Sequence, residues 1–236
     1  GWGVAAALDT DEGAEEAWRT DSSTPSHLRT RVTSEAARSI LTRNDSPDVP
    51  FEWAINPYRG CEHGCIYCYA RPTHSYLNLS PGLDFETQLI AKTHAADLLR
   101  QALRRRGYRP SPINLGSATD VYQPIERQWR LTRQLLEVLL EANHPCTLVT
   151  KSAGVLRDLD LLAELARRRL LLVFVSVTSL DRSLSRILEP RASAPQRRLE
   201  AIGRLAAAGV WVGVNVAPII PFINEPEIEQ ILQAAA

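Results

Sequence analysis

The stretch CEHGCIYC, residues 61–68, holds three of the four cysteines in this chain of 236 residues. Its spacing is C-x3-C-x2-C. Three thiolates this close together suit a metal or an iron–sulfur cluster better than a disulfide, because a disulfide would leave one cysteine over. With only three cysteine ligands, one iron of a [4Fe–4S] cluster keeps an open position for chemistry. We therefore expect Cys61, Cys65 and Cys68 to be metal ligands.

The composition predicts a single domain with a substantial core, since 44% of the residues are hydrophobic. Lysine plus arginine equals aspartate plus glutamate at 27 each, so the net charge does not favour a nucleic-acid or acidic partner. No apolar run approaches the roughly 20 residues of a membrane span, and the first residues lack the basic start of a signal peptide. Cluster-binding thiolates indicate a cytoplasmic location.

The ends of the chain predict a fragment of a longer protein. Methionine is absent, and residues 231–236 stop within a helical pattern that has no cap. We expect residues 1–48 to form an irregular N-terminal arm with one short helix at 34–41. Residues 49–236 should form the core domain, incomplete at its C-terminus.

The core has a strand-then-helix rhythm. Apolar runs predict strands at 51–58, 112–117, 146–151, 170–177 and 210–216, and amphipathic patterns predict helices at 84–106, 127–143, 156–169, 194–208 and from 225 onward. This alternation favours an α/β barrel or a doubly wound parallel sheet. Ligands of such folds bind beyond the carboxyl ends of the strands, which here means the loops at 60–69, 117–124, 151–154, 176–181 and 215–224.

The cysteine spacing at the start of such a domain resembles the radical S-adenosylmethionine (SAM) superfamily. The segments NPYRGC (56–61), TDVYQP (119–124), TKS (150–152) and LEPR (188–191) resemble its spore photoproduct lyase-like branch, whose bacterial members are often labelled DNA repair photolyases. The resemblance covers about residues 30–236. It implies an α/β fold, a partial TIM-like (βα)6 barrel, truncated here after about five βα units. One edge of the barrel would then be open.

The resemblance also implies an activity. In this superfamily three cysteines bind a [4Fe–4S] cluster, SAM chelates the fourth iron, and reductive cleavage of SAM yields a 5′-deoxyadenosyl radical. A reductant such as flavodoxin or ferredoxin supplies the electron. DNA is the substrate that the narrower branch suggests, through a lyase-type reaction. No catalytic residue beyond the cofactor ligands is identified.

The family pattern implies the SAM contacts residue by residue. The methionyl ammonium would meet oxygens of Ser117, Thr119 and Asp120. The methionyl carboxylate would meet Lys151, with Arg191 as a further candidate. The ribose would meet Ser176, and the adenine would lie near the backbone of Tyr67 and near Asn215 with the following 217–221 loop.

One departure concerns the reaction. Spore photoproduct lyase carries a hydrogen-donating cysteine in the segment that matches residues 116–120, and this chain has GSATD there. The resemblance therefore supports radical generation more than the photoproduct reaction itself.

Other interpretations of the cysteines stay open. Three cysteines with His63 would suit structural zinc, although that histidine lies only two residues from each neighbouring cysteine. A noncatalytic electron-transfer protein would need a fourth cluster ligand. The remaining thiol, Cys146, begins a strand at the opposite end of the sheet, so we expect it to be a small buried hydrophobe.

The other candidates have structural alternatives as well. Asp120 could cap the following turn, Lys151 could be a solvated lysine, and Ser176 could bind local backbone. Arg191 could pair with Glu189. The arginine runs at 104–106 and 167–169 end helices, where the helix dipole explains them without DNA. His74, His94 and His144 lack ligand spacing.

Overall fold

The computed structural model describes residues 3–4 and 29–236, and its centre is a six-stranded sheet in the order β10-β9-β8-β7-β4-β3. Five neighbouring strands run parallel: β4 (Trp53–Ile55), β7 (Ile113–Leu115), β8 (Cys146–Thr150), β9 (Leu171–Ser176) and β10 (Val212–Asn215). These are the five strands that the apolar runs predict. Each lies within the predicted run, which confirms the α/β fold class.

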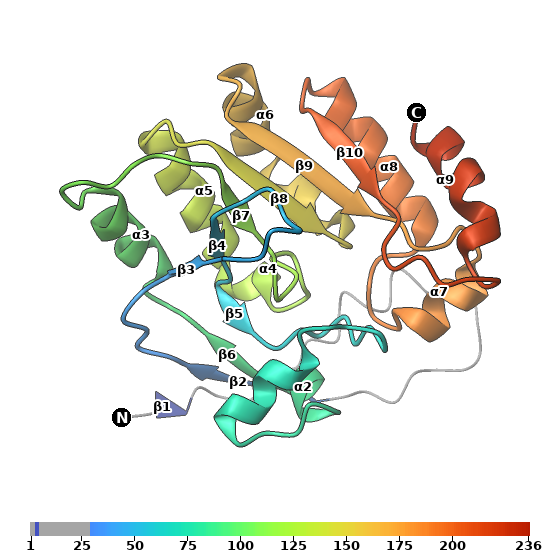
Figure 1. Cartoon of the computed structure of the whole chain (residues 1–236), viewed down its shortest axis with the longest axis horizontal. Helices are drawn as coiled ribbons and strands as arrows, with labels where there is room; N and C mark the ends of the chain where they lie inside the picture. The colour runs from blue at the N-terminus through green and yellow to red at the C-terminus, as the bar shows by residue number, and fades with distance from the viewer. Residues whose placement is uncertain (1–2, 5–28) are drawn as a thin grey trace.

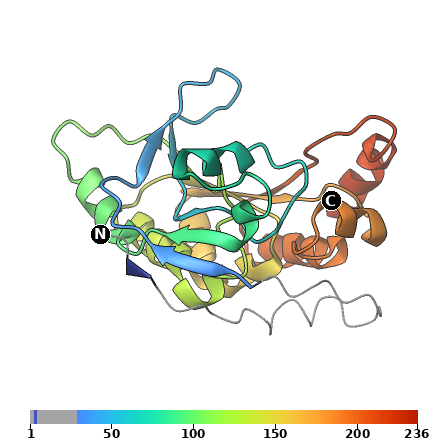
Figure 2. The same ribbon diagram turned by 90° about the horizontal axis from the view of Figure 1, so that it is seen from below.

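Helices connect the parallel strands in chain order: α3 (Ala95–Leu103), α5 (Leu131–Glu141), α6 (Leu159–Arg167) and α8 (Pro195–Ala207). Because successive strands are added in one direction with right-handed crossovers, these helices lie together on one side of the sheet (Figures 1 and 2). Their apolar faces and the strands form the main core, in which Leu135, Leu148 and Val173 are fully buried.

Short helices occupy the loops that leave the carboxyl ends of the strands. They are α4 (Glu126–Trp129) after β7, η2 (Ala153–Asp158) after β8, α7 (Arg182–Leu188) after β9, and η3 (Glu225–Glu227) with α9 (Ile228–Ala235) after β10. Helix α9 lies beside α8 (Figure 1). The expected helices at 127–143, 156–169 and 194–208 are therefore present, with the first two preceded by these shorter turns.

The expected helix at 84–106 is wrong, because it is interrupted by a strand. Helix α2 (Asp84–Thr87) is followed by β6 (Gln88–Ala91), and α3 begins only at Ala95. Strand β6 pairs with β2 (Arg31–Ser34) and with β5 (Tyr58–Arg59), in a second sheet of order β1-β2-β6-β5 that starts with β1 (Gly3–Val4). Pairing on both sides satisfies the backbone of β6 and overrides helix propensity.

The expected short helix at 34–41 is also wrong. Strand β3 (Leu41–Arg43) pairs antiparallel with β4 and forms one edge of the large sheet, while β10 forms the other edge. Among the described residues the sheet is thus open, as in a partial barrel. The division into an arm and a core at residue 48 stays a prediction, and most of that arm lies outside the described residues. No described helix is both long and apolar enough to span a membrane.

Candidate functional site

The three clustered cysteines lie in one tightly packed loop, residues 60–70, which follows β4 and β5 and which we call the cysteine loop. Cys61 and Cys65 are buried, Cys68 is half-buried, and all three are free thiols. Gly64 has a φ of +66°, and a Cβ there would press against the guanidinium of Arg191. The left-handed backbone favours glycine, and any side chain would also displace Arg191 from the loop.

Two arginines hold the backbone of the cysteine loop from outside. Arg71 donates to the carbonyls of Cys65 at 3.0 Å and Gly64 at 3.1 Å. Arg191 donates to the carbonyls of residues 62 and 63, through its side chain and its backbone N–H respectively. Both arginines also pair with Glu86. The alternative pairing of Arg191 with Glu189 is therefore wrong, because Arg191 pairs with Glu86, and Glu189 pairs with Arg198 and Lys151.

Burial raises the pKa of the Cys65 thiol to about 12 and that of the Cys61 thiol well above its ordinary value. Buried thiols of this kind become thiolates when a cation binds, and binding then releases protons. Within residues 3–4 and 29–236, no three Cys, His, Asp or Glu side chains are already gathered around one metal position. Three free thiols in one loop are nevertheless the donor set that an iron–sulfur cluster requires, so the residues present fit that group.

Asp120 joins the loop after β7 to the end of β8 and to the cysteine loop. Its carboxylate accepts hydrogen bonds from the backbone N–H of Tyr122 at 2.8 Å and of Lys151 at 2.6 Å, and from the Thr150 hydroxyl at 2.7 Å. His63 Nδ1 lies 3.3 Å away, although not aligned for a hydrogen bond. Burial alone would raise the pKa of Asp120, but His63 and these donors lower it to about 2. The turn-capping alternative is thus present in the structure.

The neighbouring candidates Ser117 and Thr119 are positioned by Asn56, which follows β4. Asn56 donates to the Ser117 hydroxyl at 2.9 Å, and its side-chain carbonyl accepts from the N–H groups of Ala118 and Thr119. The Thr119 hydroxyl is buried and has no hydrogen-bond partner. Such an orphaned group at the carboxyl end of a strand fits a bound ligand better than a packed core.

Lys151 directly follows β8 and extends toward the cysteine loop. Its Nζ lies 3.6 Å from Glu189 Oε1, and 5.7 Å from the centre of the Tyr67 ring. Glu189 is fully buried and also accepts from the Tyr67 and Thr178 hydroxyls and from Arg198. Burial would raise the pKa of Glu189, but Arg198 and Lys151 lower it to about 2. Two cations therefore share the Glu189 carboxylate, and Lys151 is the one that lies beyond hydrogen-bond distance of it.

Ser176 and Asn215 end adjacent strands, β9 and β10, and face each other in the ladder register. The Ser176 carbonyl accepts from Arg198 at 2.9 Å, and the Asn215 carbonyl accepts from the N–H of Val177 at 2.9 Å. The fold thus brings residues 117–120, Lys151, Ser176 and Asn215 to the carboxyl edge of consecutive strands. Whether each contacts SAM stays a prediction.

Cys146 lies at the other end of β8, in register with Ile113 and Leu171 and buried in the main core. Five residue steps, about 17 Å of extended chain, separate it from Lys151, whose backbone N–H binds Asp120. It is a small buried hydrophobe, as expected. Arg167 and Arg168 pair with Glu164 of their own helix, which accounts for part of that basic run.

Sequence reasoning missed three residues that hold the site. Glu189 and Arg198 form a buried pair under Lys151, and Gln123 binds the backbone beside Cys61. Glu189 lies within a segment of the family resemblance, but its partner Arg198 belongs to the next helix, and only the fold brings them together. Gln123 also lies in such a segment, and no spacing rule marks a buried glutamine as a support.

The open parallel sheet and the cysteine loop at its carboxyl edge define a protein built to bind an iron–sulfur cluster. The model of the Radical SAM superfamily matches residues 55–235, so the chain belongs to this superfamily. Its members use a [4Fe–4S] cluster and SAM, the cofactors that the cysteine spacing indicates.

Relatives of known sequence include an uncharacterized protein of Mycobacterium tuberculosis, 40% identical over 186 residues, which are 78% of this chain and 55% of the relative. An uncharacterized protein of Methanocaldococcus jannaschii is 27% identical over 176 residues, 75% of this chain and 63% of that protein. The chain thus spans about half to two thirds of these relatives.

Among solved structures, a cysteine-to-serine mutant of spore photoproduct lyase aligns with a TM-score of 0.66 at 22% identity, over 86% of this chain and 57% of that one. A double mutant of the same lyase, with bound AdoMet and dinucleoside spore photoproduct, gives a TM-score of 0.64 at 20% identity, over 86% and 56% of the two chains. At these identities the likeness establishes the shared fold.

Proposed function

We propose that this chain is the catalytic core of a radical SAM enzyme in which Cys61, Cys65 and Cys68 hold a [4Fe–4S] cluster. The observation that carries the proposal is the meeting of two features at one edge of the sheet. Three free thiols lie in a loop shaped by Gly64, and Lys151 extends an ammonium group with free donors toward the same loop. When bound, the cluster and SAM supply reductive cleavage of the sulfonium and a 5′-deoxyadenosyl radical.

The chain's own residues would bind and orient SAM. Lys151 Nζ lies beyond hydrogen-bond distance of Glu189, so it retains donors for the methionyl carboxylate. The unpartnered Thr119 hydroxyl would accept from the methionyl ammonium, with Ser117 beside it. Asp120 already accepts three hydrogen bonds and lies near His63, so we assign it to holding this loop. Ser176 and Asn215 would line the ribose and adenine side with the backbone of Tyr67, and Arg191 would act through the loop it supports.

For the substrate we propose a DNA lesion and a lyase-type reaction. The support is the fold shared with spore photoproduct lyase, including the structure that contains a dinucleoside spore photoproduct. Residues 116–120 contain no cysteine, so the hydrogen donor would differ from that of the lyase. A reductant such as flavodoxin or ferredoxin would supply the electron.

Anaerobic reconstitution with iron and sulfide, followed by dithionite and SAM, tests the proposal. We expect a bound cluster and the release of 5′-deoxyadenosine and methionine. Replacing Cys65 with alanine should abolish cluster loading and SAM cleavage. Replacing Cys146 with alanine is the matched control and should preserve both, because that thiol is buried in the main core.

Two outcomes would contradict the proposal. A protein that loads a full cluster but never cleaves SAM would be a noncatalytic iron–sulfur protein. Stoichiometric zinc in the aerobically purified protein, lost on Cys65→Ala replacement, would indicate a structural zinc site. DNA specificity is tested separately, by formation of products from oligonucleotides that carry defined thymine lesions.

A further inference from the structure

The loop after β7 contains a fully buried glutamine, Gln123, to which neither SAM binding nor the core gives a role. Its side-chain carbonyl accepts from the backbone N–H of Glu62 at 2.9 Å, and its amide donates to the carbonyl of Gly60 at 3.2 Å. These two backbone groups belong to the residues on either side of Cys61. The side chain of Gln123 therefore brackets the first cysteine of the motif.

The geometry suits a primary amide in particular. A glutamine side chain presents a donor and an acceptor side by side, as a peptide group does. In a parallel sheet, a residue of one strand hydrogen-bonds to two peptide groups of its neighbour: the C=O that precedes the facing residue and the N–H that follows it. The side chain of Gln123 makes the same pair of bonds around Cys61. The N–H of Cys61 itself donates to the carbonyl of Phe85 at 2.9 Å. The backbone at Cys61 is thus held on both sides, which sets the direction of its Cα–Cβ bond.

A second contact runs in the opposite direction between the same two loops. Glu62 is buried, and its carboxylate accepts from the backbone N–H of Ile125 at 2.6 Å. We call these three bonds between residues 60–62 and residues 123–125 the Gln123–Glu62 clasp.

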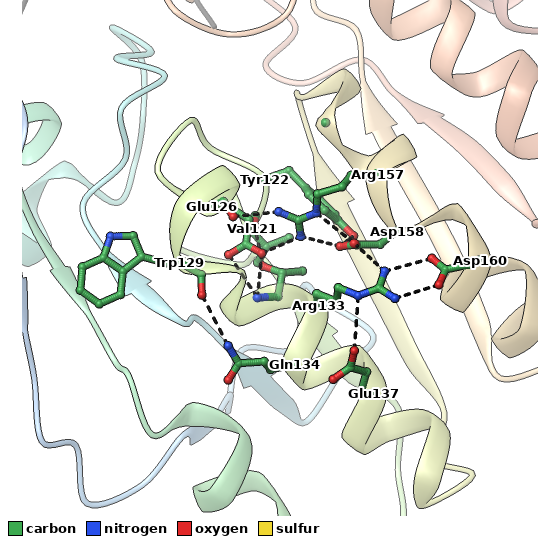
Figure 3. Close-up of polar contacts among 12 residues, drawn as sticks. Val121, Tyr122, Glu126, Trp129, Arg133, Gln134, Glu137, Arg157, Asp158 and Asp160 are labelled. Carbon is green, nitrogen blue, oxygen red and sulfur yellow. Dashed lines mark hydrogen bonds and ion pairs between the residues drawn. The ribbon is translucent and has the colours of Figure 1, made fainter. Parts of the chain in front are cut away.

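The loop after β7 has other contacts that keep it in place, so it does not depend on the clasp for its position. Figure 3 shows a separate network in which Tyr122 donates to Asp158 at 3.1 Å and Glu126 binds Arg157 at 2.8 Å. That network anchors the same loop to η2 without touching the cysteine loop backbone. Burying the polar groups of Gln123 is costly unless they are paired, and their partners here are the two peptide groups that flank Cys61.

We propose that Gln123 is a positioning residue for Cys61, with Glu62 completing the clasp, so that the thiolate is held in place for the cluster. The inference rests on the proposed binding of a [4Fe–4S] cluster and adds the support that keeps it bound. Partners of metal ligands of this kind typically change metal affinity by about 10- to 100-fold when they are removed.

The test compares Gln123→Leu with Tyr122→Phe in the reconstituted full chain. Leucine keeps the approximate volume of Gln123 but removes both bonds that bracket Cys61. Tyr122→Phe removes one buried hydrogen bond from the adjacent residue and leaves the clasp intact. The measurements are iron per protein, the rate of iron loss to a chelator, the electron paramagnetic resonance signal of the reduced cluster, and thermal unfolding of the iron-free protein.

We expect Gln123→Leu to lose iron about 10 to 100 times faster than wild type and to change the resonance signal. Tyr122→Phe should retain wild-type iron kinetics and signal, even where its unfolding temperature falls as much. Glu62→Gln, which keeps an acceptor for Ile125, should behave as wild type, whereas Glu62→Leu should resemble Gln123→Leu. If Gln123→Leu does not fold, the comparison of Glu62→Gln with Glu62→Leu tests the proposal instead.

Wild-type iron retention and signal in Gln123→Leu would overturn the inference and leave the proposed function standing. Equal iron loss in Tyr122→Phe would overturn it too, because the effect would then follow general destabilisation. A wild-type chain that takes up no cluster overturns the proposed function, and the clasp with it.

Discussion

Two ion-pair clusters with buried carboxylates lie near the carboxyl edge of the sheet, and they differ in how many cations meet each buried carboxylate. The first, shown in Figure 3, joins two buried carboxylates, Glu126 and Asp158, to two arginines, Arg157 and Arg133. Arg133 also binds the more exposed Asp160 and Glu137 at the rim of this cluster. The second, around Glu189, joins one carboxylate to two cations, Arg198 and Lys151. We call them the balanced cluster and the Glu189 cluster.

In the balanced cluster the carboxylates are fully used. Asp158 accepts from Arg157, Arg133 and the Tyr122 hydroxyl, and Glu126 accepts from Arg157 and the backbone N–H of Thr132. Such a cluster links β7 to η2 and offers little to a ligand. In the Glu189 cluster the guanidinium of Arg198 is bound to Glu189. Lys151 keeps free donors and faces Tyr67 of the cysteine loop. The free donors of Lys151 thus distinguish the Glu189 cluster, which suits an anionic ligand, from the balanced cluster.

The largest effect should come from breaking the balanced cluster. Asp158→Asn removes a fully buried charge that two arginines share, and we expect a loss of about 3 kcal/mol in the free energy of unfolding. Asp160→Asn is the control, because Asp160 binds the same Arg133 but is 60% exposed, and it should cost less than about 1 kcal/mol. Urea unfolding measures both. Equal losses would show that burial does not set the cost.

The stability that the Glu189 cluster contributes should be lost at acidic pH. The folded-state pKa of Glu189, about 2, lies below its ordinary 4.5, so its stabilisation is present above pH 4.5 and is lost as the pH falls toward 2. The difference corresponds to roughly 3 kcal/mol. Urea unfolding at several pH values should show this loss in wild type and a flatter dependence in Glu189→Gln. Parallel curves would contradict the assignment.

Removing Lys151 should separate binding from stability. Lys151→Met deletes this ammonium group, and we expect the affinity for SAM to fall about 10- to 100-fold, the value of one charge-assisted contact. Stability should change by about 1 kcal/mol or less, since Lys151 lies 3.6 Å from Glu189 and Arg198 remains. Lys151→Arg is the control and should bind SAM within tenfold of wild type. Equilibrium binding to the reconstituted protein measures the affinity, and unchanged binding in Lys151→Met would move the carboxylate contact elsewhere.

The smallest effects are expected when one tyrosine from each cluster is replaced with phenylalanine. Tyr67→Phe and Tyr122→Phe each remove a hydroxyl that donates to a buried carboxylate, so each should cost about 1–2 kcal/mol of stability. Only Tyr67→Phe should also change the affinity for SAM, by a few-fold, because it lies under Lys151 in the cysteine loop. Thermal unfolding and SAM binding on the same samples provide the comparison. A change in SAM affinity in both variants would remove the distinction between the clusters.

The local sequence pattern predicted a feature correctly where the residues that define that feature are close together in the chain. The cysteine spacing and the five apolar strand runs are such signals, and the fold and family confirm them. The helix expected at 84–106 failed because residues 88–91 find strand partners at 31–34 and 58–59, which no local pattern reveals. Long-range pairing overrode a helical periodicity that was real on each side of the break.

The sequence by itself determined the superfamily, through its cysteine spacing, and the order of the five parallel strands, through their apolar runs. Only the tertiary structure decided which polar residues remain available at the carboxyl edge of the sheet. The fold surrounds the Asp120 carboxylate with hydrogen-bond donors and leaves the hydroxyl of Thr119 without a partner. It also pairs Arg191 with Glu86 and brings Gln123 against the backbone beside Cys61. The physical reason is that hydrogen bonds and ion pairs depend on distance in space, and residues 31 to 105 positions apart meet only once the sheet has formed.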